Sequence, residues 1–435
     1  MKTASSDGAA GTQDILVSSA RLKKQLIDTI SQVANHHGFD YIETPILENI
    51  ETLKSAESDF RIFYALTGAD DAWDTGLRYD LTVPLARIVT KYWPELPKPF
   101  KRYQYGEVFR GEKPQKGRYR HFTQFDLDIV GTKNIDADIG LFMLARSTFD
   151  QINLGIISTF HINSRNFFTA LQEVLGIASE KLTELVKLFD KSEKITKEEF
   201  TSELAMLVTD SNSQEICIKL LEIIPTSEFA MMLDTVKTSS LYTDLLEEFT
   251  AVKDALDNQD AVTKYVFNPM IARGFGYYTG MVCEMKVEGF SFSVLGGGRY
   301  DNLTEKFSPQ NFPATGISFG IDRILLVLSE LGVSVKSTHD KKIVIGCLDE
   351  TAKKYTYLTL LNISKILSKD DSIEMYVADA VDAKSVLMYS LSKQATHMVI
   401  IGENEMRSAT VTIKNLITKE QATITADMVE NYLKS

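Results

Sequence analysis

Apolar side chains recur at helical spacing over residues 18–37, and Gly38 follows them. A period of three to four residues with a closing glycine predicts an amphipathic helix. Residues 39–45, rich in aromatic and β-branched side chains, then predict a strand that ends at Pro45. Further helices are expected from Val83, where the next residue is a proline suited to a first helical turn, and over residues 136–154. The N-terminal part therefore mixes short strands with helices.

The pattern changes after residue 166, where Lys, Glu, Leu and Ser recur with helical periodicity and predict a helical insertion. Its carboxylate pairs, Glu198-Glu199 and Glu247-Glu248, are expected on solvated helix faces. Strand-like sequence returns later, and the last segment alternates as β-α-β-α-β, which is typical of a compact α/β domain. The predicted division is a first core part at 1–166, a helical insertion at 167–262, a second core part at 263–332, a linker at 333–341 and a C-terminal α/β domain at 342–435.

Composition places the chain among globular proteins, with 435 residues, 44% hydrophobic and 24% charged. No uncharged apolar run approaches the roughly 18 residues of a membrane span, and the first 14 residues lack a secretory signal and predict a mobile tail. The three cysteines, Cys217, Cys283 and Cys347, form no CxxC pair, and the six histidines show no ligand spacing. We therefore expect buried thiols, a reducing cytoplasm, no membrane partner and no intrinsic transition metal.

Charge is distributed unevenly along the chain. Residues 98–120 hold eight Lys and Arg against two Glu, a local excess of +6 in a protein of net charge −12. A basic island in an acidic protein indicates a local anionic ligand, and phosphate is the ligand that we expect.

This basic stretch leads into a strand whose two faces differ. Side chains two apart share a face, so the core candidates are those of one face: Tyr119, His121, Thr123, Phe125, Leu127 and Ile129. The other face carries two cations, an amide and two carboxylates, a pattern that indicates either a ligand floor or an ion-pair network. Its members are Arg118, Arg120, Phe122, Gln124, Asp126 and Asp128.

Common nucleotide-binding loops are absent from the sequence. No GxxxxGK[ST] motif occurs, and the glycines of GFGYYTG at 274–280 are misspaced for a dinucleotide fingerprint and run on into a strand. A nucleotide site must therefore use side-chain cations. Arg110, Arg273 and Arg323 are candidates, since guanidinium groups donate to phosphate oxygens and stack on bases, although each alone could be a surface ion-pair partner.

The segment FRGEKPQKGRYRHFTQFDLDIVG, which begins at Phe109, resembles motif 2 of class II aminoacyl-tRNA synthetases, and specifically that of histidyl-tRNA synthetases. Further elements are similar to the same family and lie in the same order. They are the motif 1-like segment 38–45, RYDLT at 78–82, ARGFGYYTG at 272–280, GGGRYD at 296–301 and the motif 3-like segment GISFGIDR at 316–323.

The resemblance implies an α+β fold, with a class II antiparallel sheet flanked by helices, a helical insertion and a C-terminal α/β anticodon-binding domain. It implies ATP-dependent activation of histidine to histidyl adenylate, followed by transfer to the 3′-terminal adenosine of histidine tRNA. ATP with Mg²⁺ would be the cofactor, the ion being held by phosphate oxygens rather than by a protein metal site, and the chain would act as a homodimer.

The resemblance also implies residue roles. Catalytic residues would be Arg110, Gln124 and Arg273. ATP would be bound by Arg110, Arg118, Arg273 and Arg323. Histidine would be bound by Asp80, Thr82, Gln124, Asp128, Tyr278 and Tyr300, and the tRNA acceptor end would approach Lys113 and Gln115.

Two departures from the family pattern concern the signature segment and the last domain. Gly276 stands where the family usually has Asp, and residues 340–435 carry 12 basic and 13 acidic residues, so the domain is nearly neutral. The alternatives are the synthetase-like regulatory subunit of ATP phosphoribosyltransferase, which shares the fold without the activity, and a pseudo-synthetase domain that senses RNA. The terminal domain and the set of arginines argue for the enzyme.

Overall fold

The computed structural model describes residues 6–56, 62–67, 74–192, 195–271, 278–333, 341–367, 373–379 and 382–434. The chain divides into two compact units, residues 1–335 and 336–435. Most of the linker predicted at 333–341 lies outside the described residues. Within the described part of the chain, no helix is long and apolar enough to cross a membrane.

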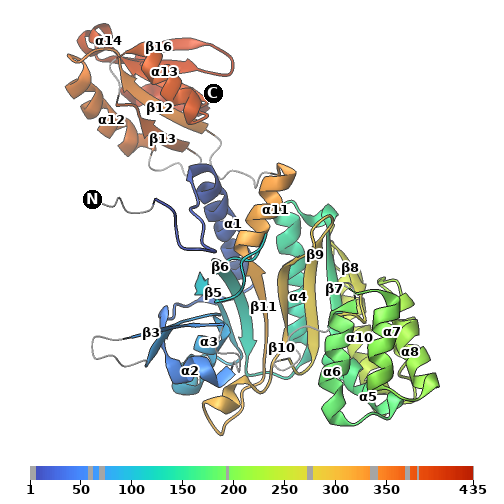
Figure 1. Cartoon of the computed structure of the whole chain (residues 1–435). Helices are drawn as coiled ribbons and strands as arrows, with labels where there is room; N and C mark the ends of the chain where they lie inside the picture. The colour runs from blue at the N-terminus through green and yellow to red at the C-terminus, as the bar shows by residue number, and fades with distance from the viewer. Residues whose placement is uncertain are drawn as a thin grey trace. The chain divides into compact units, whose positions relative to one another are not determined.

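An eight-stranded sheet forms the centre of the first unit (Figure 1). Its inner strands pair antiparallel, and the two outermost pairs, β1–β5 and β7–β8, are parallel. In spatial order the strands are β1 (Asp40–Tyr41), β5 (Phe100–Phe109), β6 (His121–Val130), β11 (Ala314–Gly320), β10 (Ser293–Arg299), β9 (Met281–Val287), β7 (Ser158–Ser164) and β8 (Lys264–Phe267).

Three helices pack against one face of this sheet: α1 (Val17–His36), α4 (Ile135–Gln151) and α11 (Ile321–Leu331) (Figure 1). The apolar face of β6 meets them, since Phe125, Leu127 and Ile129 are buried in the same core as residues of all three helices. Each such side chain contributes about 1.5–3 kcal/mol when it is fully buried. The helices thus cover the apolar face of β6, and its polar side chains point to the opposite side of the sheet.

The predicted elements near the N-terminus are present but shorter or shifted. Gly38 follows α1 in the left-handed conformation, with φ 75°, as its place after the helix predicts. The strand expected over 39–45 is restricted to the two residues of β1. The rest of this region forms a small sheet with two helices: β2 (Leu47–Asn49), β3 (Tyr64–Leu66), β4 (Thr75–Leu77), α2 (Ile50–Ala56) and α3 (Thr82–Tyr92).

Between β7 and β8 the chain is helical, in the region where the sequence predicts an insertion. Glu198 and Glu199 are exposed as expected, and Glu199 completes a capping box with Thr196. Glu247 is exposed as well, whereas Glu248 is half-buried, and burial raises the pKa of its carboxyl to about 7. The helices are α5 (Arg165–Leu175), α6 (Ser179–Asp190), α7 (Lys197–Leu207), α8 (Ser211–Glu222), α9 (Ala230–Asp234) and α10 (Tyr242–Asp257).

The second unit is a five-stranded mixed sheet with its own apolar core. The β-α-β-α-β alternation is confirmed by β12 (Lys341–Cys347), α12 (Lys353–Leu367), β13 (Ile373–Val377), α13 (Ala383–Ser392) and β14 (His397–Ile401). The sequence reading did not include the elements that follow, which are α14 (Glu403–Ser408), β15 (Thr410–Asn415), β16 (Gln421–Thr425) and α15 (Val429–Lys434). All three cysteines of the chain are free and buried, as predicted.

Candidate active site

Strand register brings the polar face of β6 between matching residues of its two neighbours. Arg102 on β5 and Gly316 on β11 flank Asp128, and Ser318 on β11 lies beside Asp126. Paired residues point to the same side of a sheet, so these side chains share the face opposite the helices. The polar face of β6 is therefore part of one polar surface formed by β5, β6 and β11. The sequence left open whether such a surface is the floor of a ligand site or an ion-pair network.

Asp128 is the most constrained carboxylate of this surface. Its Oδ2 lies 2.6 Å from Nη2 of Arg102, and the hydroxyl of Tyr300 donates to its Oδ1. Arg102 is fully buried and Asp128 nearly so. Burial raises the pKa of Asp128, while the charge of Arg102 and the Tyr300 hydrogen bond oppose the shift. A Cβ on Gly316 would lie 2.0 Å from Oδ1, so glycine is needed there to admit the carboxylate.

Asp126 lies next to Asp128 on the same face and connects to Gln124. Ser318 donates its hydroxyl to Asp126, and Nε2 of Gln124 donates to Ser318 Oγ at 2.7 Å. Burial raises the pKa of Asp126 to about 7, with Arg102 opposing the shift and Asp128 adding to it. Two adjacent buried carboxyls thus share Arg102 as a buried cationic partner.

Asp80 lies two residues before α3, and Thr82 is the first residue of that helix. Asp80 accepts a hydrogen bond from the backbone N–H of Val83 at 3.1 Å, so its carboxylate also caps the helix. Burial raises the pKa of Asp80 to about 6, and the Val83 hydrogen bond and the charges of Arg110 and Arg102 oppose the shift. Asp80 and Asp126 therefore both interact electrostatically with Arg102.

The segment that carries Asp80 is fastened to the β5–β6 hairpin by Arg78. Its Nε donates to the carbonyl of Glu107 at 2.9 Å, and its Nη1 donates to the carbonyl of Thr44 at 2.8 Å. A Cβ on Gly106 would lie 2.3 Å from the guanidinium, so this close approach depends on glycine. Arg78 therefore orients a segment that contributes to the site without lining its cavity.

A cavity of about 290 Å³ opens beside this polar surface. Arg110, Arg118, Gln124, Tyr278 and Arg323 are among the residues that line it. A space of this size at a sheet face, with several converging cations, fits a ligand with anionic groups.

Backbone contacts hold two of these arginines in place. Nε of Arg110 donates to the carbonyl of Tyr79 at 2.9 Å, and its Nη2 lies 3.4 Å from Oε1 of Gln124. Nε of Arg323 donates to the carbonyl of Gly117 at 2.8 Å, and its Nη1 donates to the carbonyl of Ser293 at 2.9 Å. Such anchoring reduces the conformational entropy lost when a guanidinium binds an anion.

Arg118 differs from these two. It is exposed and pairs with Glu112, with 3.0 Å between Nη1 and Oε2. Of the eight basic residues in 98–120, Arg110 and Arg118 line the cavity. Other cations of this stretch have partners within the protein: Arg102 is buried against Asp128, and Lys116 pairs with Glu330.

Of the remaining predicted residues that the structure describes, Tyr278 lines the cavity, whereas the others do not; these are Asp80, Thr82, Lys113, Gln115, Asp128 and Tyr300. Tyr278 is partly buried on its wall, and burial, together with Cys283 and nearby carboxylates, raises the pKa of its phenol. Tyr300 is nearly fully buried. Lys113 and Gln115 are exposed in the loop between β5 and β6, where Gln115 and Arg118 exchange backbone hydrogen bonds. Arg273 and Gly276 lie outside the described residues.

The N-terminal segment also reaches this loop. The backbone N–H of Arg120 donates to the carbonyl of Gly11 at 2.8 Å, and Gln13 lies 3.3 Å from Asp322. The prediction of a mobile tail therefore does not hold for residues 9–13, because these contacts tie them to the cavity's border.

Sequence reasoning missed Arg102 and Ser318 as parts of the site and gave Asp126 no role. The signal for Arg102 was present, since Phe100, Arg102 and Gln104 alternate along β5 as three buried residues of one face. An arginine in the middle of a buried strand face requires a charged partner. Which carboxylate it pairs with depends on the register of β5 against β6.

Comparisons with known proteins agree with this geometry. Residues 11–324 match the family model described as histidyl-tRNA synthetase, and residues 342–435 match the one described as anticodon binding domain. The histidine–tRNA ligase of Helicobacter hepaticus is 35% identical over 419 residues, which cover 94% of this chain and 93% of the relative.

Solved structures give the same result. The crystal structure of histidyl-tRNA synthetase from Nostoc sp. PCC 7120 covers 99% of this chain and 100% of its own, with a TM-score of 0.84 and 25% identity. A Bacillus halodurans structure, described as an ATP phosphoribosyltransferase regulatory subunit/histidyl-tRNA synthetase, covers 92% of this chain and 99% of its own, with a TM-score of 0.74; at 19% identity it supports the fold alone. The mixed α+β fold and the resemblance inferred from the motifs are confirmed, and the chain belongs to the histidyl-tRNA synthetase family.

Proposed function

We propose that this chain activates histidine with ATP to form histidyl adenylate and transfers the histidyl group to the 3′-terminal adenosine of histidine tRNA. The observation that carries the proposal is the position of Asp128. It is a buried carboxylate at the end of a polar surface that continues into a cavity lined by Arg110 and Arg323. One end of this surface suits a small cationic or hydrogen-bond-donating side chain, and the other suits phosphates.

Amino-acid selection would depend on the carboxylate end. Asp128 would accept a hydrogen bond from one imidazole nitrogen, Tyr278 would contact the other, and Tyr300, which donates to Asp128, would close the pocket. A side chain that lacks imidazole donors would leave one buried hydrogen-bonding position of Asp128 unfilled, beside its contacts with Arg102 and Tyr300, and an unmade hydrogen bond of this kind costs about 1–3 kcal/mol. Asp80, Thr82 and Gln124 would hold the α-amino group.

The chemical step would take place between the two ends. Arg110 and Arg323 would bind ATP, with Arg323 against the adenine and Arg118 at the cavity's exposed side. Gln124, which lies within 3.4 Å of Arg110, would position the carboxylate of histidine as it attacks the α-phosphate. Arg273 would stabilise the charge that develops there, and loss of one such donor typically costs about 10²–10³ in rate.

Mg²⁺ would enter with ATP and neutralise phosphate charge. Glu112 is one carboxylate at the cavity, and no group of three or more potential ligands occurs among the described residues. A site of this composition fits a magnesium ion whose ligands come mainly from phosphate oxygens and water.

The tRNA would contact both units. Lys113 and Gln115 are exposed next to the cavity and would approach the acceptor end. The C-terminal unit would bind the anticodon, although its residues are nearly neutral in charge. We retain the division at 1–166, 167–262, 263–332, 333–341 and 342–435 as a proposal, with the first and third segments forming the catalytic core.

A homodimer is also proposed. Large apolar side chains are exposed at the β1 edge of the sheet, where Tyr41 stacks on Tyr105 with ring centroids 5.5 Å apart. Exposed aromatic clusters of this kind are typical of subunit interfaces. The three free, buried cysteines fit a reducing compartment, and we propose the cytoplasm.

The alternative is a regulatory subunit of ATP phosphoribosyltransferase without synthetase activity. ATP–pyrophosphate exchange with each of the twenty amino acids separates the two. Exchange that requires histidine supports the enzyme, whereas a folded protein without exchange for any amino acid supports the regulatory role.

A further inference from the structure

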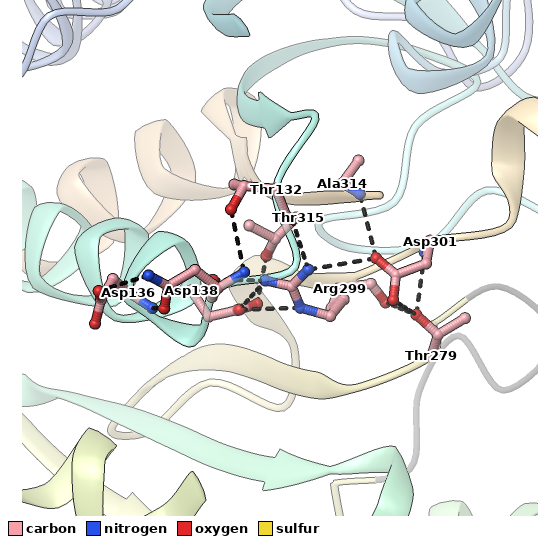
Figure 2. A network of polar contacts seen from close by, with 9 residues as sticks. Thr132, Asp136, Asp138, Thr279, Arg299, Asp301, Ala314 and Thr315 are labelled. Atoms are coloured by element: carbon pink, nitrogen blue, oxygen red, sulfur yellow. Dashed lines mark hydrogen bonds and ion pairs between the residues drawn. The ribbon is translucent and has the colours of Figure 1, made fainter. Parts of the chain in front are cut away.

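Arg299, at the end of β10, is buried and uses all of its donors. Its Nε and Nη2 contact Asp138, its Nη1 donates to the carbonyl of Thr132 at 3.1 Å, and its Nη2 donates to the carbonyl of Asn134 at 3.1 Å. A second Nη1 contact reaches Asp301 at 3.3 Å (Figure 2). A guanidinium has five N–H donors, so this one is fully satisfied.

The carboxylate side of the network joins a helix to the sheet. Asp138 belongs to α4, is completely buried and accepts from the hydroxyl of Thr315 on β11 at 2.7 Å. Arg299 and Asp138 are 161 residues apart in the chain. Burial raises the pKa of Asp138, and the charge of Arg299 opposes the shift. Together these contacts connect helix α4 to strands β10 and β11.

Asp301 extends the network to the segment that precedes β9. Its Oδ2 accepts from the hydroxyl of Thr279 at 3.1 Å, and its backbone N–H donates to the same hydroxyl at 3.0 Å. The backbone N–H of Thr279 in turn donates to the carbonyl of Arg299 at 2.7 Å. Thr279 is therefore held at its side chain, whose contacts Figure 2 shows, and at its backbone.

The residues next to these anchors are the two pocket tyrosines. Tyr278 directly precedes Thr279, and Tyr300 lies between Arg299 and Asp301. The backbone of Tyr300 donates to the carbonyl of Ala314 at 2.7 Å, and its hydroxyl reaches Asp128. Neither Arg299 nor Thr279 is among the residues that line the cavity, so the network acts on the pocket through the tyrosines.

We propose that the Arg299 network, defined as Arg299, Asp138, Asp301, Thr279 and Thr315, positions the histidine pocket by setting the backbone of Tyr278 and Tyr300. Thr279 is the positioning residue that determines where the Tyr278 phenol lies relative to Asp128. The proposal rests on the assignment of this pocket to histidine. It predicts that loosening Thr279 impairs recognition of histidine while leaving the ATP contacts of Arg110, Arg118 and Arg323, which come from the β5–β6 loop and α11, unaffected.

The test compares Thr279→Val with Thr279→Ser in histidine-dependent ATP–pyrophosphate exchange. Valine has nearly the same shape but lacks the hydroxyl, so both Asp301 contacts are lost; serine keeps the hydroxyl. We expect Thr279→Val to raise the KM for histidine about tenfold, which corresponds to about 1.4 kcal/mol. The KM for ATP should remain at the wild-type value, and Thr279→Ser should remain close to wild type in both constants.

A merely structural role would give a different pattern. Thr279→Val would then lower the thermal unfolding midpoint and leave both KM values unchanged, or raise them together, and either result overturns the proposal. If Thr279→Val does not fold, Asp301→Asn, which keeps the shape but replaces one acceptor with a donor, must show the same selective rise in the KM for histidine. Wild-type protein without histidine-dependent exchange would instead refute the proposed function itself, before any variant is compared.

Discussion

The buried pair of Arg102 and Asp128 makes a strong prediction about stability and its dependence on pH. Arg102 is 0% exposed and Asp128 is 3% exposed, and their charged atoms are 2.6 Å apart. Replacing Arg102 with Met keeps most of the volume but leaves Asp126 and Asp128 without their buried cation. Removal of one partner of such a pair costs about 3–5 kcal/mol. Among the residues that the structure describes, Nε and Nη1 of Arg102 find no hydrogen-bond partner, which places the expected loss at the lower end of that range.

The loss should depend on pH in a defined direction. Burial raises the pKa of Asp126 from 3.8 to about 7, so the folded protein binds this proton more tightly than the unfolded chain does. A raised carboxyl pKa stabilises the fold fully below the unfolded value, and this contribution is lost as the pH rises through about 7. Without Arg102, protonation of Asp126 and Asp128 is the remaining way to neutralise the buried charge. The variant should therefore be closer to wild type at about pH 5.5 than at about pH 8.

Urea unfolding followed by tryptophan fluorescence measures this effect in the first unit, because both tryptophans of the chain, Trp73 and Trp93, belong to it. Arg118→Met is the matched control, since its exposed pair with Glu112 is worth about 0–1 kcal/mol. The double variant Arg102→Met with Asp128→Asn should regain much of the lost stability. The reasoning is refuted if Arg102→Met is as stable as wild type at about pH 8, or if the double variant is no more stable than the single one.

Three further predictions concern the proposed chemistry. Gly316→Ala should lower histidine-dependent exchange by about tenfold or more, because its Cβ would lie 2.0 Å from Asp128; Gly140→Ala, on the exposed side of α4 with nothing within 4 Å of the added Cβ, is the control and should be tolerated. Asp128→Ala should raise the KM for histidine more than the KM for ATP, and the reverse order in steady-state exchange would show that the imidazole pocket is misplaced. Arg273→Ala should nearly abolish adenylate formation while circular dichroism remains unchanged, and wild-type exchange in this variant would remove its assigned role.

Much of the fold could be predicted because local patterns report directly on local structure. The helical spacing before Gly38 predicted α1, and the alternation along residues 121–130 separated the core face of β6 from its polar face. The helical character between 167 and 262 and the β-α-β-α-β order of the last unit were visible for the same reason. Strand lengths were less predictable: β1 is two residues long because its pairing with β5, and not its own sequence, ends it.

The residues of the candidate site could be predicted where they belong to sequence motifs that occur in the order typical of the family. Gln124 and Asp128 were identified on the polar face of one strand, and Arg110, Arg323 and Tyr278 do line one cavity. The roles of these residues stay predictions until exchange is measured. The capping of α3 by Asp80 had a signal in the sequence, because an aspartate shortly before a helix with a proline in its first turn is a common helix start.

Taken alone, the sequence determined which faces are apolar, which segments are helical and which motifs occur in which order, since these depend on neighbouring residues. Tertiary structure decided the partners. Arg102 meets Asp128 through the register of β5 against β6, and Arg299 meets Asp138 across 161 residues of chain. A charged residue in a buried strand indicates that a partner must exist, because an unpaired buried charge is costly. Which partner it finds is set by the packing of distant elements, and local patterns carry no information about that.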